Sequence, residues 1–224
     1  MHPINHARSS ASAFGGHPDG HLPFHAFLDQ TKMACATVQH RVFLHSADLG
    51  LALAQARFGT HIDVGSGLGV SVEAMMMRHL DEDLGIRATL ADWLRHVDPD
   101  DAGRQWYYGD MMPEAQPFSV DPAAAAAVVW GGDPEDYRPL TNLLKLGETV
   151  SRHPLANAPL MSSVGPFLAE QCLGAVINLS TMGSVPTRVV AERMILGMHG
   201  TIEPASRLPE AIPLQDWMRG KPVK

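Results

Sequence analysis

The chain has 224 residues, of which 45% are hydrophobic and 18% charged, and its formal net charge is −7. This balance is typical of a globular protein, and no apolar run approaches the roughly 20 residues of a membrane span. We therefore expect no membrane partner. We also expect no nucleic-acid partner, because an acidic chain without clustered Lys and Arg cannot neutralise phosphates. The two cysteines give no disulfide framework and the first residues lack an apolar signal core, which favours a cytoplasmic protein.

One stretch of the chain occurs twice. An aromatic ring, Gly-Gly, Pro, an acid, a second Pro and an apolar tail begin at Phe14 and recur in the same order from Trp130. The glycine pairs should end helices, because Gly accepts the left-handed conformation that closes a helix. We therefore predict helices over 5–14 and 122–130, each stopped by Gly-Gly. A turn and a helix that opens at Pro23 follow the first pair.

Further along the chain the two copies differ. Residues 31–58 carry apolar positions three and four apart, interrupted only by Gly50, and predict one long core helix. In the second copy three prolines forbid a continuous helix, so only 166–173 should be helical there. The remaining predicted elements are short strands near 61–64 and 176–179 and helices over 72–84 and 187–196.

Each copy closes on an Asp-Trp pair, Asp92-Trp93 in the first and Asp216-Trp217 in the second. We expect a mainly α protein whose two homologous units pack about a pseudo-twofold axis, because units this small gain core by docking. Two units that share little surface are the alternative. The predicted segments are a first repeat unit over 1–97, a linker over 98–120 that is rich in Asp, Gly and Pro, and a second, degenerate unit over 121–224.

The segment Ile62–Gly69 resembles the glycine loop of nucleotide-binding or methyl-donor-binding folds. Such a loop works when a buried strand leads into it and alternating strands and helices follow. Here a helix precedes it, and the second copy has Asn178–Gly183 at the same place. The pattern therefore favours a turn or short hairpin over a nucleotide site.

Short motifs in the first unit also match a known family. They are His6–Ala11, Gly15-Gly16, Pro23-Phe24-His25, His40-Arg41, His45, His79 and Ala91–Leu94. Together they resemble an uncharacterised domain family of bacteria and their phages. The resemblance covers the first unit well and the second only in its turns and ending. Gln39 departs from the family's usual Arg. The resemblance implies a fold unit with a polar constellation, with no assigned activity, and a virion-associated location if the chain is phage-encoded.

The histidines are the residues that indicate a functional site. Neutral imidazole is the commonest ligand of Zn and Fe in proteins, and carboxylates complete or orient such sites. Three acids lie one turn after such histidines, Asp29 after His25 and both Glu82 and Asp83 after His79. Asp29 and Glu82 are the candidate catalytic groups for moving protons. The candidate metal ligands are His6, His25, His40, His45 and His79.

Helix geometry limits this metal hypothesis. On the predicted helix over 31–58, His40 and His45 would lie roughly 140° apart around the axis. Both could not easily bind one ion, so any site must draw its ligands from several helices. Spacing alone does not show such a site, and the signal is weaker than a His-Glu-x-x-His motif.

In the second copy these histidines disappear together. A set retained only for folding should persist in part, so we infer that the first unit carries a site that the second has lost. The counterparts are Pro122–Ala126 for His6–Ser10, Thr141 for His25 and Met194 for His79.

The leading hypothesis is a metal-binding protein, with Zn or Fe as the ion, which extends to a metal-dependent hydrolase or oxidase. The alternative for the residues is a set of histidines with ordinary hydrogen bonds. The alternative for the protein is a non-catalytic phage or bacterial structural, assembly or interaction protein, with a protein partner or a homo-oligomer.

Overall fold

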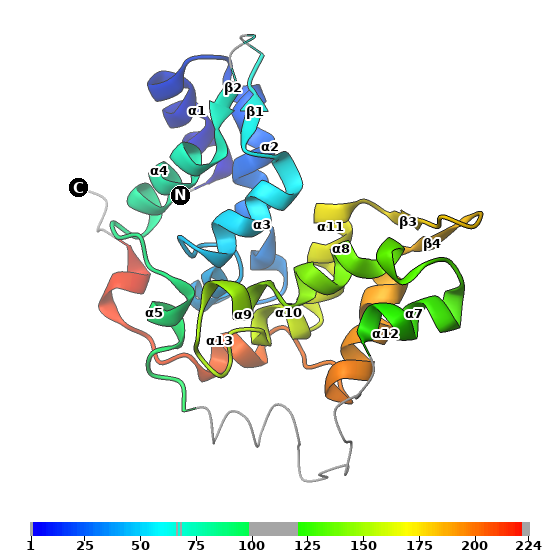
Figure 1. Cartoon of the computed structure of the whole chain (residues 1–224). Coiled ribbons are helices and arrows are strands. Elements are labelled where there is room, and N and C mark those ends of the chain that lie inside the picture. Colours follow the sequence, from blue (N-terminus) through cyan, green and yellow to red (C-terminus); the bar gives the residue numbers. More distant parts are fainter. Residues whose placement is uncertain (1, 66, 68, 99–120, 221–224) are drawn as a thin grey trace. The chain divides into compact units, whose positions relative to one another are not determined.

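The structure is a computed structural model, which describes residues 2–65, 67, 69–98 and 121–220 (Figure 1). It is mainly helical with two small antiparallel hairpins, so the predicted fold class is confirmed. The chain forms two compact units, Met1–Arg95 with Ile212–Lys224, and His96–Ala211. Apart from Asp98, the predicted linker lies outside the described residues. No helix among the described residues is long and apolar enough to cross a membrane.

Short helices and one hairpin build the first unit. In the hairpin, Ile62 lies opposite Val70, so the glycine-rich segment forms the predicted hairpin. The elements are α1 (Pro3–Phe14), α2 (Pro18–Asp29), the 3-10 helices η1 (Gln30–Met33) and η2 (Val38–Val42), α3 (Leu49–Phe58), β1 (His61–Asp63), β2 (Gly69–Ser71), α4 (Val72–Asp83), α5 (Leu90–Leu94) and the 3-10 helix η4 (Asp216–Arg219).

The second unit repeats this order with local changes. Its hairpin has the same register, with Ile177 opposite Val185. The elements are α7 (Pro122–Trp130), α8 (Pro134–Leu144), α9 (Leu146–Val150), α10 (Ala158–Met161), α11 (Val164–Leu173), β3 (Val176–Asn178), β4 (Ser184–Pro186), α12 (Thr187–His199) and α13 (Arg207–Ala211).

The two Gly-Gly turns have the same construction in both units. All four of their glycines have positive φ, a conformation that side chains disfavour. In the first unit His21 Nε2 donates a hydrogen bond to the Gly15 carbonyl oxygen at 2.8 Å. In the second, the Tyr137 hydroxyl donates to the Gly131 carbonyl oxygen at the same distance. The exchange of His for Tyr therefore preserves a turn, and this histidine has a structural role.

The prediction of one long helix over 31–58 is wrong. The chain there forms η1, η2 and α3, separated by loops. Polar side chains cap the backbone at the last break, because the Asp48 carboxylate accepts the Leu49 N–H at 2.7 Å and the Ser46 hydroxyl accepts the Gly50 N–H at 2.9 Å. Such local bonds compete with a continuous helix. His40 and His45 therefore do not lie on one helix, and the predicted angle of roughly 140° between them does not apply.

The second helix also begins earlier than predicted. α2 starts at Pro18 instead of Pro23, since His17 Nδ1 accepts the Asp19 N–H at 3.3 Å and Pro suits the first helical position. The predicted ends of the Gly-stopped helices are confirmed, at Phe14 and at Trp130.

The closing Asp-Trp segments of both repeats pack in the first unit. Trp93 is fully buried, and its indole N–H donates to the His45 carbonyl oxygen at 3.2 Å. The Trp217 ring meets it edge-on with 4.7 Å between centroids. The end of the second repeat thus completes the core of the first unit. The packing of the two units about a pseudo-twofold axis stays a prediction.

We predict that Gly50→Ala destabilises the first unit by about 2 kcal/mol, because the core at this point is already filled. A Cβ at Gly50 would lie 2.3 Å from the Leu44 carbonyl oxygen. Helix propensity alone would give the opposite sign, since Ala is normally favoured over Gly by about 1 kcal/mol. Urea unfolding would measure the change.

Ala56→Gly, at an exposed position of the same helix, calibrates the propensity effect. A Gly50→Ala protein as stable as the wild type would show that the close approach between α3 and the preceding loop does not exist.

Candidate metal centre

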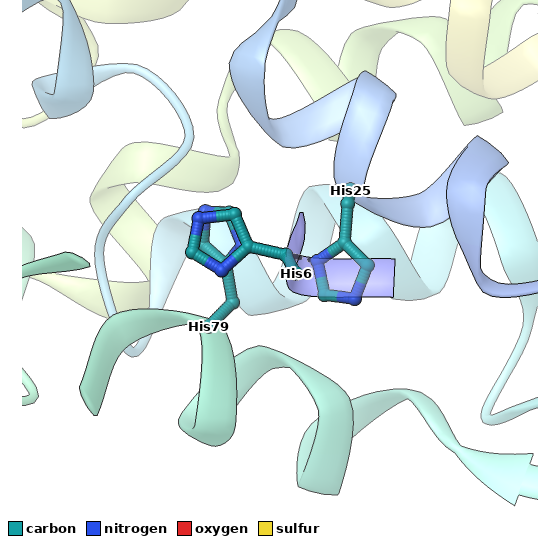
Figure 2. Close-up of side chains that lie close together, drawn as sticks. All are labelled: His6, His25 and His79. Carbon is teal, nitrogen blue, oxygen red and sulfur yellow. Dashed lines mark hydrogen bonds between the residues drawn. The ribbon is translucent and has the colours of Figure 1, made fainter. Parts of the chain in front are cut away.

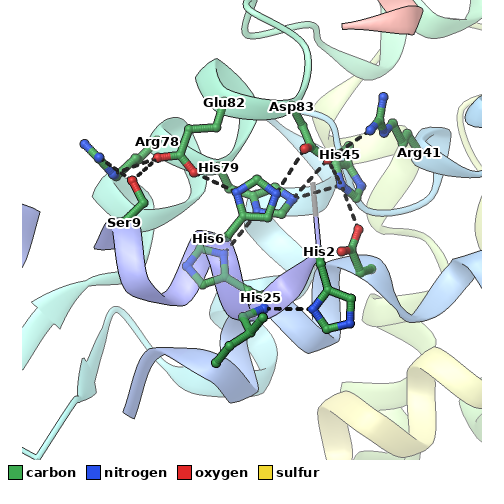
Figure 3. Close-up of polar contacts among 12 residues, drawn as sticks. His2, His6, Ser9, His25, Arg41, His45, Arg78, His79, Glu82 and Asp83 are labelled. Atoms are coloured by element: carbon green, nitrogen blue, oxygen red, sulfur yellow. Dashed lines mark hydrogen bonds and ion pairs between the residues drawn. The ribbon is translucent and has the colours of Figure 1, made fainter. Parts of the chain in front are cut away.

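Segments far apart in the sequence bring buried and half-buried polar side chains to one place in the first unit (Figures 2 and 3). All five predicted histidine ligands are at most 4% exposed. The contributing residues are His6, Ser9 and Ser10 on α1, His25 and Asp29 on α2, His45 in the loop before α3, and Arg78, His79, Glu82 and Asp83 on α4.

We define the carboxylate–histidine cluster as Asp29, His45, His79 and Asp83. The Nε2 atoms of His45 and His79 are 2.9 Å apart. His45 Nε2 lies 3.6 Å from Asp29 Oδ1 and 3.5 Å from Asp83 Oδ2. His79 Nε2 lies 3.8 Å from Asp83 Oδ2. Ligands of a tetrahedral zinc ion are about 3.3 Å apart. The four residues therefore could hold a metal ion after small shifts, and their potential ligand atoms all lie within 4.8 Å of one another.

His79 also belongs to the three-histidine group, His6, His25 and His79 (Figure 2). Its Nδ1 lies 3.0 Å from Nδ1 of His25. His25 Nε2 in turn lies 2.9 Å from the Ser10 hydroxyl oxygen. Two nitrogens at this distance share one proton, so His79 faces the cluster with one nitrogen and this hydrogen-bonded chain with the other.

His6 lies between two carboxylates (Figure 3). Its Nδ1 is 2.6 Å from Glu82 Oε2, and its Nε2 is 3.0 Å from Asp83 Oδ1. Ionised carboxylate oxygens only accept hydrogen bonds, so both nitrogens must donate. The ring therefore bridges α1 and α4 through both of its nitrogens.

His40 lies outside both groups. Its Nδ1 is 2.6 Å from the Thr37 carbonyl oxygen, which holds the ring within its own turn. Its ring centroid is 6.0 Å from that of His45. The structure thus brings four of the five predicted histidines into the two groups, and His40 neighbours them without joining.

Burial keeps the central histidines neutral. It lowers the pKa of His25 to about 3, with the charge of His6 as the next cause. Burial also lowers the pKa of His45, and it lowers that of His79 well below its ordinary value, with neighbouring histidines adding to the effect. Neutral imidazoles offer the lone pairs that a metal ion needs.

Asp83 stays ionised beside these histidines. Burial would raise the pKa of its carboxyl, but hydrogen bonds from His45 and His6 outweigh burial and hold the pKa well below its usual range. Arg41 Nη2 also lies 3.1 Å from Asp83 Oδ2. The cluster therefore presents an anionic ligand, not a neutral acid.

Asp29 is the least satisfied member of the cluster. The Lys32 ammonium lies 2.6 Å from Asp29 Oδ1. Neither carboxylate oxygen nonetheless has a hydrogen bond of normal geometry within the described chain, and the same is true of His45 Nδ1. Buried polar atoms without partners are rare, and an ion is one way to satisfy them.

The two predicted catalytic acids take different places. Asp29 belongs to the carboxylate–histidine cluster. Glu82 instead binds His6 and the Ser9 hydroxyl toward the edge of the group (Figure 3). The sequence pattern placed Asp83 beside these histidines, although it was not among the predicted ligands. The signal was present, because Asp83 follows His79 by the same one-turn spacing that separates Asp29 from His25.

The second unit contains no such constellation among its described residues. Thr141, the counterpart of His25, donates to the Tyr137 carbonyl oxygen at 3.2 Å. Met194 and Met198 occupy the positions of His79 and Asp83. The polar interior is therefore a property of the first unit.

The family comparison matches the chain twice. The family described as a domain of unknown function (DUF6915) matches residues 1–103 and again 118–218. No curated protein and no solved structure matches the chain.

We predict that the protein without metal loses stability as the pH falls from 7 to 5. The pKa values of His25, about 3, and of His40, about 4, lie below the ordinary 6.5, so the unfolded chain binds protons first in this range. The contribution of each group is complete above pH 6.5 and falls by roughly 2 kcal/mol at pH 5. Urea unfolding in the presence of EDTA at several pH values would measure it.

His25→Asn should reduce this pH dependence. His17→Asn should not, because His17 is an exposed cap that Asn can replace. A flat profile between pH 7 and 5 would show that these rings are not buried in the neutral form.

Proposed function

The chain belongs to the DUF6915 family, and we propose that the first of its two domain copies binds one divalent transition-metal ion through the carboxylate–histidine cluster. Two imidazole nitrogens and two carboxylate oxygens converge there. The proposed ligand atoms are Asp29 Oδ1, His45 Nε2, His79 Nε2 and Asp83 Oδ2.

One observation carries the proposal, namely that two imidazole nitrogens and two carboxylate oxygens converge at one buried place. His45 Nε2 and His79 Nε2 face each other and two carboxylate oxygens, and neutral rings supply at most one proton each. The buried Asp29 oxygens also lack ordinary hydrogen bonds. A cation at the centre would contact all four atoms at once, with Lys32 and Arg41 as outer partners of the same two carboxylates.

The donor set favours zinc or iron. Imidazole suits Zn and Fe, and carboxylate completes both, while Ca and Mg prefer sites made entirely of oxygen. The site also has an outer layer, because His79 Nδ1 meets His25 and Asp83 Oδ2 meets Arg41. Such partners orient metal ligands and fix their tautomers.

The first role of the ion is to hold the unit together. The ligands come from α2, from the loop before α3 and from the last turn of α4. Unfolding separates these segments, so metal binding stabilises the folded unit. All four ligands are at most 6% exposed, which fits an ion enclosed by protein.

Catalysis is the second candidate, favoured by a polar groove beside the cluster. A groove of about 630 Å³ is lined by Phe14, Arg78 and Glu82 among others. Glu82 binds His6, which binds Asp83, so this acid would carry protons between the groove and the centre. When bound, the ion would supply Lewis acidity or redox chemistry, which makes the reaction a hydrolysis or an oxidation of a small molecule.

Metal content is the direct test. The purified protein should carry about one equivalent of Zn or Fe by elemental analysis, and Asp29→Asn should lower the affinity at least about tenfold by removing a ligand charge at constant shape. His40→Asn is the matched control, because His40 is equally buried but lies outside the cluster. We expect it to keep its metal.

Removing the metal should lower the unfolding midpoint of the wild type more than that of Asp29→Asn, because the variant binds the ion more weakly. Free metal at a hundredfold excess over Kd stabilises by about 2.7 kcal/mol. Wild-type protein that neither retains added Zn or Fe nor gains stability from them would refute the proposed site.

Glu82→Gln separates the catalytic candidate from the structural one. Loss of proton transfer should reduce turnover by roughly a hundredfold, measured as ester hydrolysis for the zinc form or oxygen consumption for the iron form. Metal content should be unchanged. Metal-loaded wild type without either activity would leave the ion a structural role alone.

A further inference from the structure

The second unit has an apolar cavity where the first unit has charge. A cavity of about 430 Å³ lies between α7 and α12. Its wall is apolar except at Arg193, and part of it is open, since Val129 is 69% and Val189 46% exposed. The apolar lining includes Ala125, Val129 and Trp130 from α7 and Val189, Met194 and Met198 from α12.

The repeat shows how this cavity arises. In the first unit the matching helices α1 and α4 are bridged by Glu82, which accepts a hydrogen bond from Ser9 and pairs with Arg78. In the second unit the serine and the glutamate have been replaced by smaller residues, and the arginine has been kept. The counterparts are Ala125 for Ser9, Gly197 for Glu82 and Arg193 for Arg78.

Arg193 therefore has no counterpart of the glutamate that pairs with Arg78 in the first unit. Arg78 Nε lies 3.0 Å from Glu82 Oε1 one turn along α4. The same position on α12 is a glycine, and none of the described residues forms an ion pair with Arg193. A cation therefore stands at the rim of an otherwise apolar cavity.

We infer that this cavity binds an aliphatic carboxylate. Its volume lies within the range of small-ligand sites, roughly 300–1,000 Å³, which are mostly apolar with a few polar groups. The chain of the ligand would cover the exposed Val129 and Val189, and burial of each CH₂ contributes about 0.8 kcal/mol. The carboxylate would replace the missing glutamate at Arg193 through charge-assisted hydrogen bonds.

Isothermal titration of the full chain with decanoate, below its micellar concentration, tests the inference. Decanoate should bind with about one equivalent per chain. Decanol, which has the same chain without the charge, should bind roughly tenfold more weakly. Arg193→Gln should remove the difference between the two ligands.

Gly197→Glu restores the acid of the first unit and provides the sharpest variant. The new glutamate should pair with Arg193 as Glu82 pairs with Arg78, and its side chain should fill the cavity. Decanoate binding should then be abolished while α12 remains helical. Ala125→Leu should block the cavity without adding charge. Val128→Glu is the matched control, since Val128 is 87% exposed on the same helix and does not line the cavity, and binding should persist.

Three results would overturn the inference. The first is a wild type that does not bind decanoate, and the second is binding that survives in both Gly197→Glu and Ala125→Leu. The third is self-association of the chain that these variants abolish and decanoate does not, which would assign the surface to a second copy. Metal loading of the first unit is a separate measurement, so failure here leaves the cluster untouched.

Discussion

The interior of the first unit depends on the compensation of one buried carboxylate, Asp83. An ionised carboxylate away from water costs several kcal/mol unless donors and cations surround it. His6 donates to one of its oxygens, while Arg41 and His45 face the other. These partners come from α1, η2 and the following loop, so the compensation of one charge fixes three segments against α4. The same arrangement gathers the nitrogen and oxygen atoms that could hold a metal ion.

The two copies share the same order of elements, but the interior of the first is polar and that of the second is apolar. Both have the Gly-Gly turn, the hairpin and a long helix after the hairpin, yet Met198 replaces Asp83 and Met194 replaces His79 in the second. A buried network that loses one member leaves the others unpaired at a cost of about 1–3 kcal/mol each. The members should therefore be lost together, which explains the block-wise disappearance of the histidines. The space that they leave becomes apolar, and Arg193 marks where the charge had been.

The sequence identified the kinds of side chain at the site but not which of them meet. Glu82 and Asp83 are neighbours on α4, and successive helical residues point roughly 100° apart. Only the packing of α1 and α2 against this helix decides that Asp83 faces the cluster and Glu82 the groove. From the sequence, His40 and His45 were both candidate ligands, although a single helix would place them roughly 140° apart. The separate 3-10 turn instead holds His40 against the Thr37 carbonyl oxygen.

The sequence by itself determined what has a local cause. Helices end at Gly-Gly because those glycines adopt positive φ, caps act on the next two or three residues, and the repeat reveals two units of one mainly helical fold. Tertiary structure decided the breaks within 31–58, because the Asp48 carboxylate that starts α3 also accepts the distant Leu90 N–H at 2.8 Å. It likewise placed Trp217, from the end of the second repeat, against Trp93 in the first unit. Hydrogen bonds and ring contacts between residues far apart in the chain have no periodicity that a sequence pattern could reveal.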